Sequence, residues 1–187
     1  MTATRLQAIN NDKTKQLVTQ GTALCFDFGE MRIGVAMGEH MLAIAHPLTT
    51  IEAESNDDKF AAISALVKEW QPSVLVVGLP LSMDGEEHAM TLLSKKFARR
   101  LDGRFGIPVV MIDERLTSSE ASQTLKEMGI GGRRQKPMLD QVAAQHILQS
   151  YFDSVSHQAS PQASQEANPN SDLSQHLPQE PSRHESS

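Results

Sequence analysis

Three acidic residues of this chain fall at the ends of predicted strands or helices, inside segments that are otherwise apolar. Asp27 lies near the end of an apolar run over residues 23–29, Glu114 ends a second run over residues 107–114, and Asp140 opens the last predicted helix. Converging carboxylates repel one another unless a cation neutralises them. Oxygen ligands without histidine or cysteine favour Mg²⁺ or Mn²⁺, and such a cluster can hold two ions that activate a water and stabilise a leaving oxygen. The three acids are therefore candidate metal ligands and catalytic residues.

Each of these acids also has a simpler structural interpretation. Asp27 could cap the turn between the first two strands, Glu114 could belong to a charged turn, and Asp140 could be a first-turn acid that complements the helix dipole. Spacing alone leaves both interpretations open. The segment Asp27-Phe28-Gly29 also matches a protein kinase motif, but neither an HRD-type loop nor a preceding glycine-rich loop accompanies it, so a kinase is excluded.

Two groups of basic residues and one separate arginine are candidates for contact with a phosphate backbone. They are Lys95, Lys96, Arg99 and Arg100 on the second predicted helix, Arg133, Arg134 and Lys136 after a glycine-rich loop, and Arg115 beside Glu114. The helix group could equally be a solvated face, and Arg115 could pair with an acid. The loop group is the stronger candidate, because flexible glycines let backbone N–H groups and arginines surround a phosphodiester. No aromatic residues are interleaved for base stacking, so we expect recognition of backbone and shape.

Composition indicates one soluble domain with an aliphatic core. The chain has 187 residues, of which 39% are hydrophobic and 4% aromatic, and its single cysteine, Cys25, excludes an internal disulfide and fits a reducing compartment. No signal sequence is visible and no apolar run approaches the roughly 18 residues of a membrane span, which predicts a cytoplasmic protein with no membrane partner. The net charge of −6 argues mildly against a nucleic-acid partner, so binding would need local basic patches.

The hydrophobic pattern predicts an α/β domain over residues 22–152. Residues 1–21 are polar and are interpreted as a mobile arm. Residues 153–187 are rich in Ser, Gln and Pro and are interpreted as a disordered tail, because they cannot bury enough apolar surface to offset their ordering entropy.

Within this domain, period and turn signals predict the order β-β-β-α-β-α-β-α-α. Strands are predicted over 23–29, 32–38, 41–48, 74–80 and 107–114, and helices from Ser55 or Asn56 to Trp70, across Met90–Leu101, from Thr117, and across Met138–Phe152, with a glycine-rich loop at 129–132. Pro47 either ends the third strand or places it at a sheet edge. Three antiparallel strands followed by alternating helices and strands give a five-stranded mixed sheet with helices on both faces.

Five motifs in this order resemble the YqgF/RuvX family. They are LCFDFGEMRIGVAMG (24–38), VVGLPLSMDG (76–85), KKFARRL (95–101), IDERLTSSEA (112–121) and KPMLDQVAAQHILQSYF (136–152). The resemblance implies an RNase H-like domain, in the cytoplasm, that cuts ribosomal RNA precursors during 5′-end maturation of 16S rRNA; an older description of the family is Holliday junction resolvase. By motif, the implied acids are Asp27, Glu114 and Asp140, with Mg²⁺ or Mn²⁺ as cofactor.

One feature departs from the pattern that the resemblance implies. In many RNase H-like nucleases the second acid stands on the fourth strand, whereas the fourth strand here ends Gly78-Leu79-Pro80 with no acid until Asp84. Either Glu114 reaches in from the fifth strand, or Asp84 or Asp113 shares its role.

Three other functions compete with that of an rRNA-processing nuclease. An ATP-binding protein of the actin-like superfamily would need two such domains, and the ordered core here is long enough for one. A non-catalytic assembly factor that binds pre-rRNA stays open. Resolution of a four-way junction would require two active sites and hence a dimer, but the sequence shows no dimer seam, which leaves a monomer or a weak homodimer.

Overall fold

The computed structural model describes residues 6–8, 20–82, 84–114 and 135–159. The elements in chain order are β1 (Leu6–Ala8), β2 (Thr22–Phe28), β3 (Arg32–Glu39), β4 (Ile44–Glu52), α1 (Asn56–Trp70), β5 (Val74–Leu79), α2 (Ala89–Phe105), β6 (Val109–Asp113) and α4 (Gln135–Ala159). The predicted helix from Thr117 and the glycine-rich loop at 129–132 lie outside the described residues.

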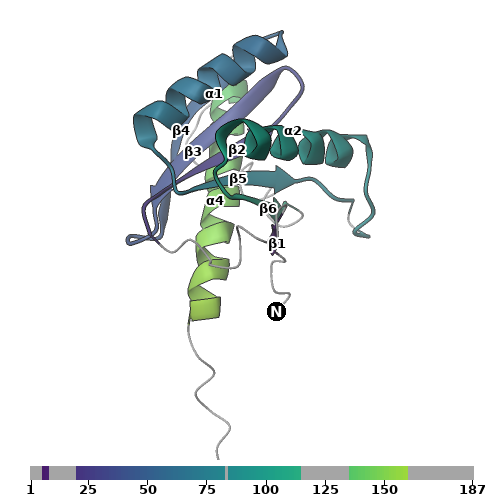
Figure 1. Cartoon of the computed structure of the whole chain (residues 1–187). Coiled ribbons are helices and arrows are strands. Elements are labelled where there is room, and N and C mark those ends of the chain that lie inside the picture. Colours follow the sequence, from purple (N-terminus) through teal and green to yellow (C-terminus); the bar gives the residue numbers. More distant parts are fainter. Residues whose placement is uncertain (1–5, 9–19, 83, 115–134, 160–187) are drawn as a thin grey trace, which may run out of the picture.

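The strands form one mixed sheet in the order β1-β6-β5-β2-β3-β4. Strands β2, β3 and β4 are antiparallel neighbours, whereas β5 and β6 run parallel to β2. Helices α1 and α2 cover one face and α4 crosses the other (Figure 1). This is the RNase H-like arrangement predicted from the sequence, with all five predicted strands present.

A sixth strand, β1, extends the sheet at one edge. Residues 6–8 pair antiparallel with β6, Leu6 opposite Ile112 and Ala8 opposite Val110. The interpretation of residues 1–21 as a mobile arm is therefore corrected for these three residues. A three-residue strand is too short to leave a period in the sequence, so nothing distinguished it from its polar surroundings.

Alternation along the strands divides the apolar residues into two cores. Buried Leu24 and Phe26 of β2 face α1 and α2, whereas Ala23 and Cys25 face α4. Every residue of β5 is buried, as expected for a central parallel strand covered on both faces. Helix α1 begins where predicted, because the Ser55 side chain accepts a hydrogen bond from the backbone N–H of Asp58.

The third predicted strand is shifted toward the C-terminus. It was expected over 41–48, but residues 41–43 form a turn in which the N–H groups of Leu42 and Ala43 donate to the carbonyl of Glu39. Met41 is 93% exposed. The prediction was wrong at these residues because it took an exposed apolar side chain in a turn for the first residue of a strand. Pro47 lies inside β4, which is tolerated because β4 is an edge strand.

Helix α4 is longer than the predicted helix, beginning at Gln135 and ending at Ala159. The predicted domain boundary at 152 is therefore too early, since Val155 is buried against the core under α4. The hydroxyl groups of Ser154 and Ser156 donate to the carbonyls of Ser150 and Phe152, one turn back, so the helix accommodates these polar side chains. The sequence analysis missed these last turns of α4 because serine-rich segments are typical of disordered tails.

Three glutamines at one-turn spacing tie α4 to the edge strand. The Gln145 side chain donates to the Ala45 carbonyl, and Gln149 accepts from the Ala45 N–H and donates to the Ala43 carbonyl. Gln141 donates to the Thr50 hydroxyl. Backbone groups of an exposed edge strand would otherwise be free to pair with another chain, so these amides protect the edge and fix α4 along it.

None of the described helices is both long and apolar enough to cross a membrane.

Shortening the chain tests the corrected boundary. Removal of residues 153–187 takes away buried Val155, so we expect the free energy of unfolding to fall by about 1 to 3 kcal/mol, which is several degrees in Tm for a chain of this size. Removal of residues 160–187 alone should leave Tm unchanged. Calorimetry on both shortened chains makes the comparison, and equal Tm values would restore the boundary at 152.

Candidate active site

Asp27 and Glu114 lie on the α4 face at the edge where the parallel strands end. Phe26 of β2 is level with Val77 of β5, so the next residue, Asp27, is level with Gly78. The preceding residues on this face, Cys25 and its counterparts on β5 and β6, belong to the core under α4. Alternation therefore places Asp27 and Gly78 side by side on this face. Glu114 shares the face from two residues beyond Ile112, the β6 residue that is level with Gly78.

Glu114 occupies space that a side chain on β5 would fill. A Cβ atom built on Gly78 would stand 1.7 Å from Glu114 Oε1 and 2.9 Å from Cδ1 of Ile147. The Glu114 N–H also donates to the Leu79 carbonyl, at 3.2 Å, which keeps its backbone against β5. The sequence left open whether Glu114 reaches in from the fifth predicted strand. It does reach over β5, because that strand carries a glycine there.

Asp140 approaches from α4. It is in the second turn of that helix rather than the first, so it is not the first-turn acid of the simpler interpretation. A Cβ on Gly34 would stand 1.9 Å from the Asp140 carbonyl oxygen, and Gly34 is the β3 partner of Asp27. The close contact between α4 and β3 therefore places Asp140 beside Asp27.

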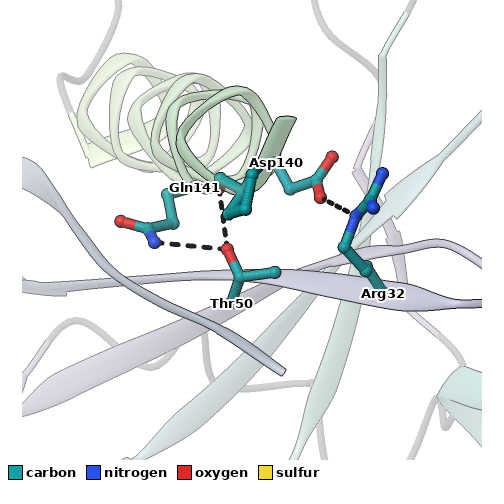
Figure 2. A network of polar contacts seen from close by, with 5 residues as sticks. Arg32, Thr50, Asp140 and Gln141 are labelled. Carbon is teal, nitrogen blue, oxygen red and sulfur yellow. Dashed lines mark hydrogen bonds and ion pairs between the residues drawn. The ribbon is translucent and has the colours of Figure 1, made fainter. Parts of the chain in front are cut away.

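The Asp140 side chain forms an ion pair with Arg32 of β3. Arg32 Nε donates to Asp140 Oδ2 at 2.8 Å (Figure 2). On the other side of the helix, the Thr50 hydroxyl donates to the Pro137 carbonyl at 2.7 Å and accepts from Gln141 Nε2 at 3.2 Å (Figure 2). The first turns of α4 are thus held between β3 and β4.

The acids act on one another electrostatically. Burial, and then the charge of Asp140, raise the pKa of Asp27 from 3.8 to about 6. Burial, followed by the charges of Asp27 and Asp113, raises the pKa of Glu114 from 4.5 to about 8. Burial raises the pKa of the Cys25 thiol well above its usual value, with smaller contributions from Asp27 and Glu114. These groups form one cluster in which each negative charge disfavours the next.

The cluster is not assembled as a closed metal site. Among the described residues, no three His, Cys, Asp or Glu side chains converge closely enough to hold an ion. The structure brings Glu114 toward Asp27 and puts Asp140 next to Asp27, but Oδ2 of Asp140 is engaged by Arg32. Asp84 is exposed and accepts from the N–H of Glu86 in a local turn.

The predicted basic residues divide between the two faces. Lys95 pairs with Glu87. The other predicted basic residues of α2 are exposed and lie on the side of the sheet away from the acids: Lys96, Arg99 and Arg100. Lys136 is exposed in the first turn of α4, one turn before Asp140. The predicted positions Arg115, Arg133 and Arg134 lie outside the described residues.

Sequence reasoning missed three positions that shape the site. Gly34 and Gly78 make room for α4 and for Glu114, and Arg32 binds Asp140. A glycine inside a strand is a recognisable signal for close approach of another chain segment. The partner of Arg32 left no such signal, because Asp140 is 108 positions away.

An RNase H-like sheet with acidic groups gathered at this edge defines a nuclease domain. Residues 21–154 match the RuvX family, described as "Holliday junction resolvase", and the chain belongs to this family. Relatives named "Putative pre-16S rRNA nuclease" include those of Methylobacillus flagellatus, 67% identical over 73% of this chain and 94% of the relative, and Nitrosomonas eutropha, 58% identical over 77% and 91%. Membership makes the chain a hydrolytic nuclease and confirms the resemblance found in the motifs.

Among solved structures, Thermus thermophilus RuvC in complex with a Holliday junction substrate aligns with a TM-score of 0.45 and 12% identity, over 73% of this chain and 96% of that one. A likeness of this degree carries no conclusion about substrate.

The raised pKa values of Asp27 and Glu114 predict how stability depends on pH. Between the unfolded and the folded pKa values, the folded state holds protons that the unfolded chain has already released. Its stability therefore falls as pH rises through the folded pKa values, here about 6 and about 8. In EDTA, Tm should therefore fall from about pH 5 to about pH 8.5 more steeply for wild type than for Asp27→Asn or Glu114→Gln. Glu69→Gln is the matched control, because Glu69 is exposed on α1, and the slope of its Tm against pH should equal that of wild type. Parallel slopes for all four proteins would contradict the shifts.

Substitution at Gly78 tests the placement of Glu114. In Gly78→Ala the new methyl group must displace the carboxylate of Glu114, and a misplacement of about 1 Å at a reacting centre can cost on the order of 10²-fold in rate. We expect phosphodiester cleavage to fall accordingly. Gly103→Ala is the control: a Cβ there meets nothing within 4 Å, and alanine in a helix adds roughly 0.5 to 1 kcal/mol of stability. Equal cleavage by the two variants would mean that Glu114 is not needed where the structure puts it.

Proposed function

We propose that the protein is a metal-dependent endonuclease that matures the 5′ end of pre-16S rRNA, with Asp27, Glu114 and Asp140 as its acidic residues. The observation that carries the proposal is the Glu114 carboxylate reaching over Gly78 toward Asp27, at the edge of a sheet in a RuvX-family chain. The names of the relatives support the choice of RNA, and such a role belongs in the cytoplasm.

The residues at this edge fit Mg²⁺ or Mn²⁺. The donors are carboxylate oxygens, which these hard cations prefer. The raised pKa values of Asp27 and Glu114 mean that the site disfavours its own negative charge, and a divalent cation would remove that penalty. Asp27 and Glu114 would hold the first ion, and Asp140 would contribute to a second after leaving Arg32. The bound ions would supply an activated water and stabilise charge on the leaving oxygen.

The chain itself supplies orientation and substrate binding. In the reaction, an oxygen–phosphorus bond forms to water, the bond from phosphorus to the leaving oxygen breaks, and the proton lost by water balances the one gained by the leaving group. Lys136 stands one turn from Asp140 and would attract the phosphate backbone. Arg115, Arg133 and Arg134 would extend this contact. Lys96, Arg99 and Arg100 would hold only a substrate that wraps around to the other face.

A second candidate is resolution of four-way DNA junctions, which the description of the matched family favours. Symmetric cleavage of a junction needs two active sites, so this candidate requires a dimer under working conditions.

Cleavage of a labelled pre-16S 5′ leader, with Mg²⁺, Mn²⁺ or EDTA, tests the proposal. Wild type should cut only with a divalent ion. Asp27→Asn should lose on the order of 10²-fold or more, because an ion that stabilises the transition state by several kcal/mol is no longer held. Asp84→Asn is the matched control, since Asp84 is exposed in a local turn, and it should cut normally.

The other outcomes separate the alternatives. Metal-dependent cutting of a synthetic four-way junction but not of the leader would favour the resolvase. RNA binding with no cutting by wild type in any metal would point to a non-catalytic assembly factor.

A further inference from the structure

Arg32 uses only part of its guanidinium group in this structure. Its Nε donates to Asp140 Oδ2 at 2.8 Å, and neither terminal nitrogen is bonded to another described residue (Figure 2). The side chains are 33% and 28% exposed, so water and a ligand can reach both. An arginine bound through one nitrogen keeps donors available for an anion such as phosphate.

The backbones that carry this ion pair are fixed, whereas the side chains are not. Arg32 is paired in the β3–β4 ladder opposite Glu52. The Asp140 backbone lies against Gly34, where there is no room for even a Cβ. Any rearrangement at this point is therefore confined to rotation of the Arg32 and Asp140 side chains.

Charge gives each side chain a second possible partner. The carboxylate of Asp140 lies close enough to Asp27 for its charge to act there. Without Arg32, Asp140 would add an uncompensated negative charge to a cluster that already contains Glu114. A divalent cation bound to Asp27 would attract Asp140 more strongly than a half-exposed arginine does, because it carries twice the charge in a more buried position.

We propose that Arg32 is a phosphate-binding residue. Asp140 holds its guanidinium until a divalent cation replaces Arg32 as the partner of Asp140. When the cation binds, Asp140 turns toward Asp27 and the guanidinium of Arg32 is released at the mouth of the site. There it binds a phosphate of the nucleic acid next to the acidic cluster. Metal binding and substrate binding are thereby coupled through one ion pair. This inference rests on the proposed metal-dependent nuclease.

The first measurement is Mn²⁺ binding to the full chain without nucleic acid, by calorimetric titration. If Arg32 competes for Asp140, Arg32→Gln should bind Mn²⁺ about two- to fivefold more tightly than wild type, the range expected for loss of a partly exposed ion pair. Mn²⁺ should also raise Tm more in Arg32→Gln than in wild type. Lys68→Gln, an exposed change of the same charge on α1, should behave as wild type. A merely structural role for Arg32 would instead weaken Mn²⁺ binding.

The second measurement is binding of a labelled RNA leader in EDTA and in Mn²⁺, with Asp27→Asn and Asp140→Asn alongside. Wild type should bind RNA more tightly in Mn²⁺, and Arg32→Gln should lose most of that gain while still binding the ion. Arg32→Lys should keep part of it, since lysine keeps the charge but not the planar fork.

Unchanged or weaker Mn²⁺ binding in Arg32→Gln, while wild type binds the ion through Asp27, would overturn the Arg32 proposal and leave the nuclease standing. Absence of Mn²⁺ binding to wild type, or Mn²⁺ binding indifferent to Asp27→Asn, would overturn both.

Discussion

The site depends on how closely α4 can lie against the sheet. Two β3 residues beneath it are glycines: a Cβ on Gly34 would stand 1.9 Å from the Asp140 carbonyl, and a Cβ on Gly38 would stand 2.7 Å from the ring of Phe152. Ala36, between them on the same face, is also small. Glycine in a strand weakens it by roughly 0.5 to 1 kcal/mol relative to alanine, which the buried aromatic residues of α4 offset. The same approach brings Asp140 within range of Asp27.

Polar contacts add to the apolar packing in fixing the position of α4 along its axis. The hydrogen bonds of Gln145 and Gln149 to Ala45 can form at only one position of the helix along β4. At the far end of the sheet, Tyr151 shares a hydrogen bond with His40, whose other ring nitrogen bonds the Gly21 carbonyl. The glutamines that protect the sheet edge thus also help to hold Asp140 in place.

Much of the fold was predictable because its signals are local. The unbroken apolar run of β5, the Ser55 cap and the place of Asp27 near the end of an apolar strand depend on neighbouring residues, and each agrees with the structure. The reach of Glu114 was not predictable, because it depends on the register between β5 and β6 and on an absent side chain at Gly78. The partner of Arg32 depends on packing across the whole sheet.

If the proposed function holds, the balance of charge gives the site a physical reason to bind its cation before its substrate. The chain carries a net charge of −6, and the mouth of the site gathers carboxylates whose pKa values are raised by burial and, after it, by their mutual repulsion. A polyanion approaching this edge without a cation would meet charges of its own sign. Among the described residues, the positive charge that pairs with one of these acids is Arg32, which is bound to Asp140. In the proposed coupling, a bound cation would remove the repulsion and free the arginine in one step, so that the site would attract phosphate only when it is also equipped to cut.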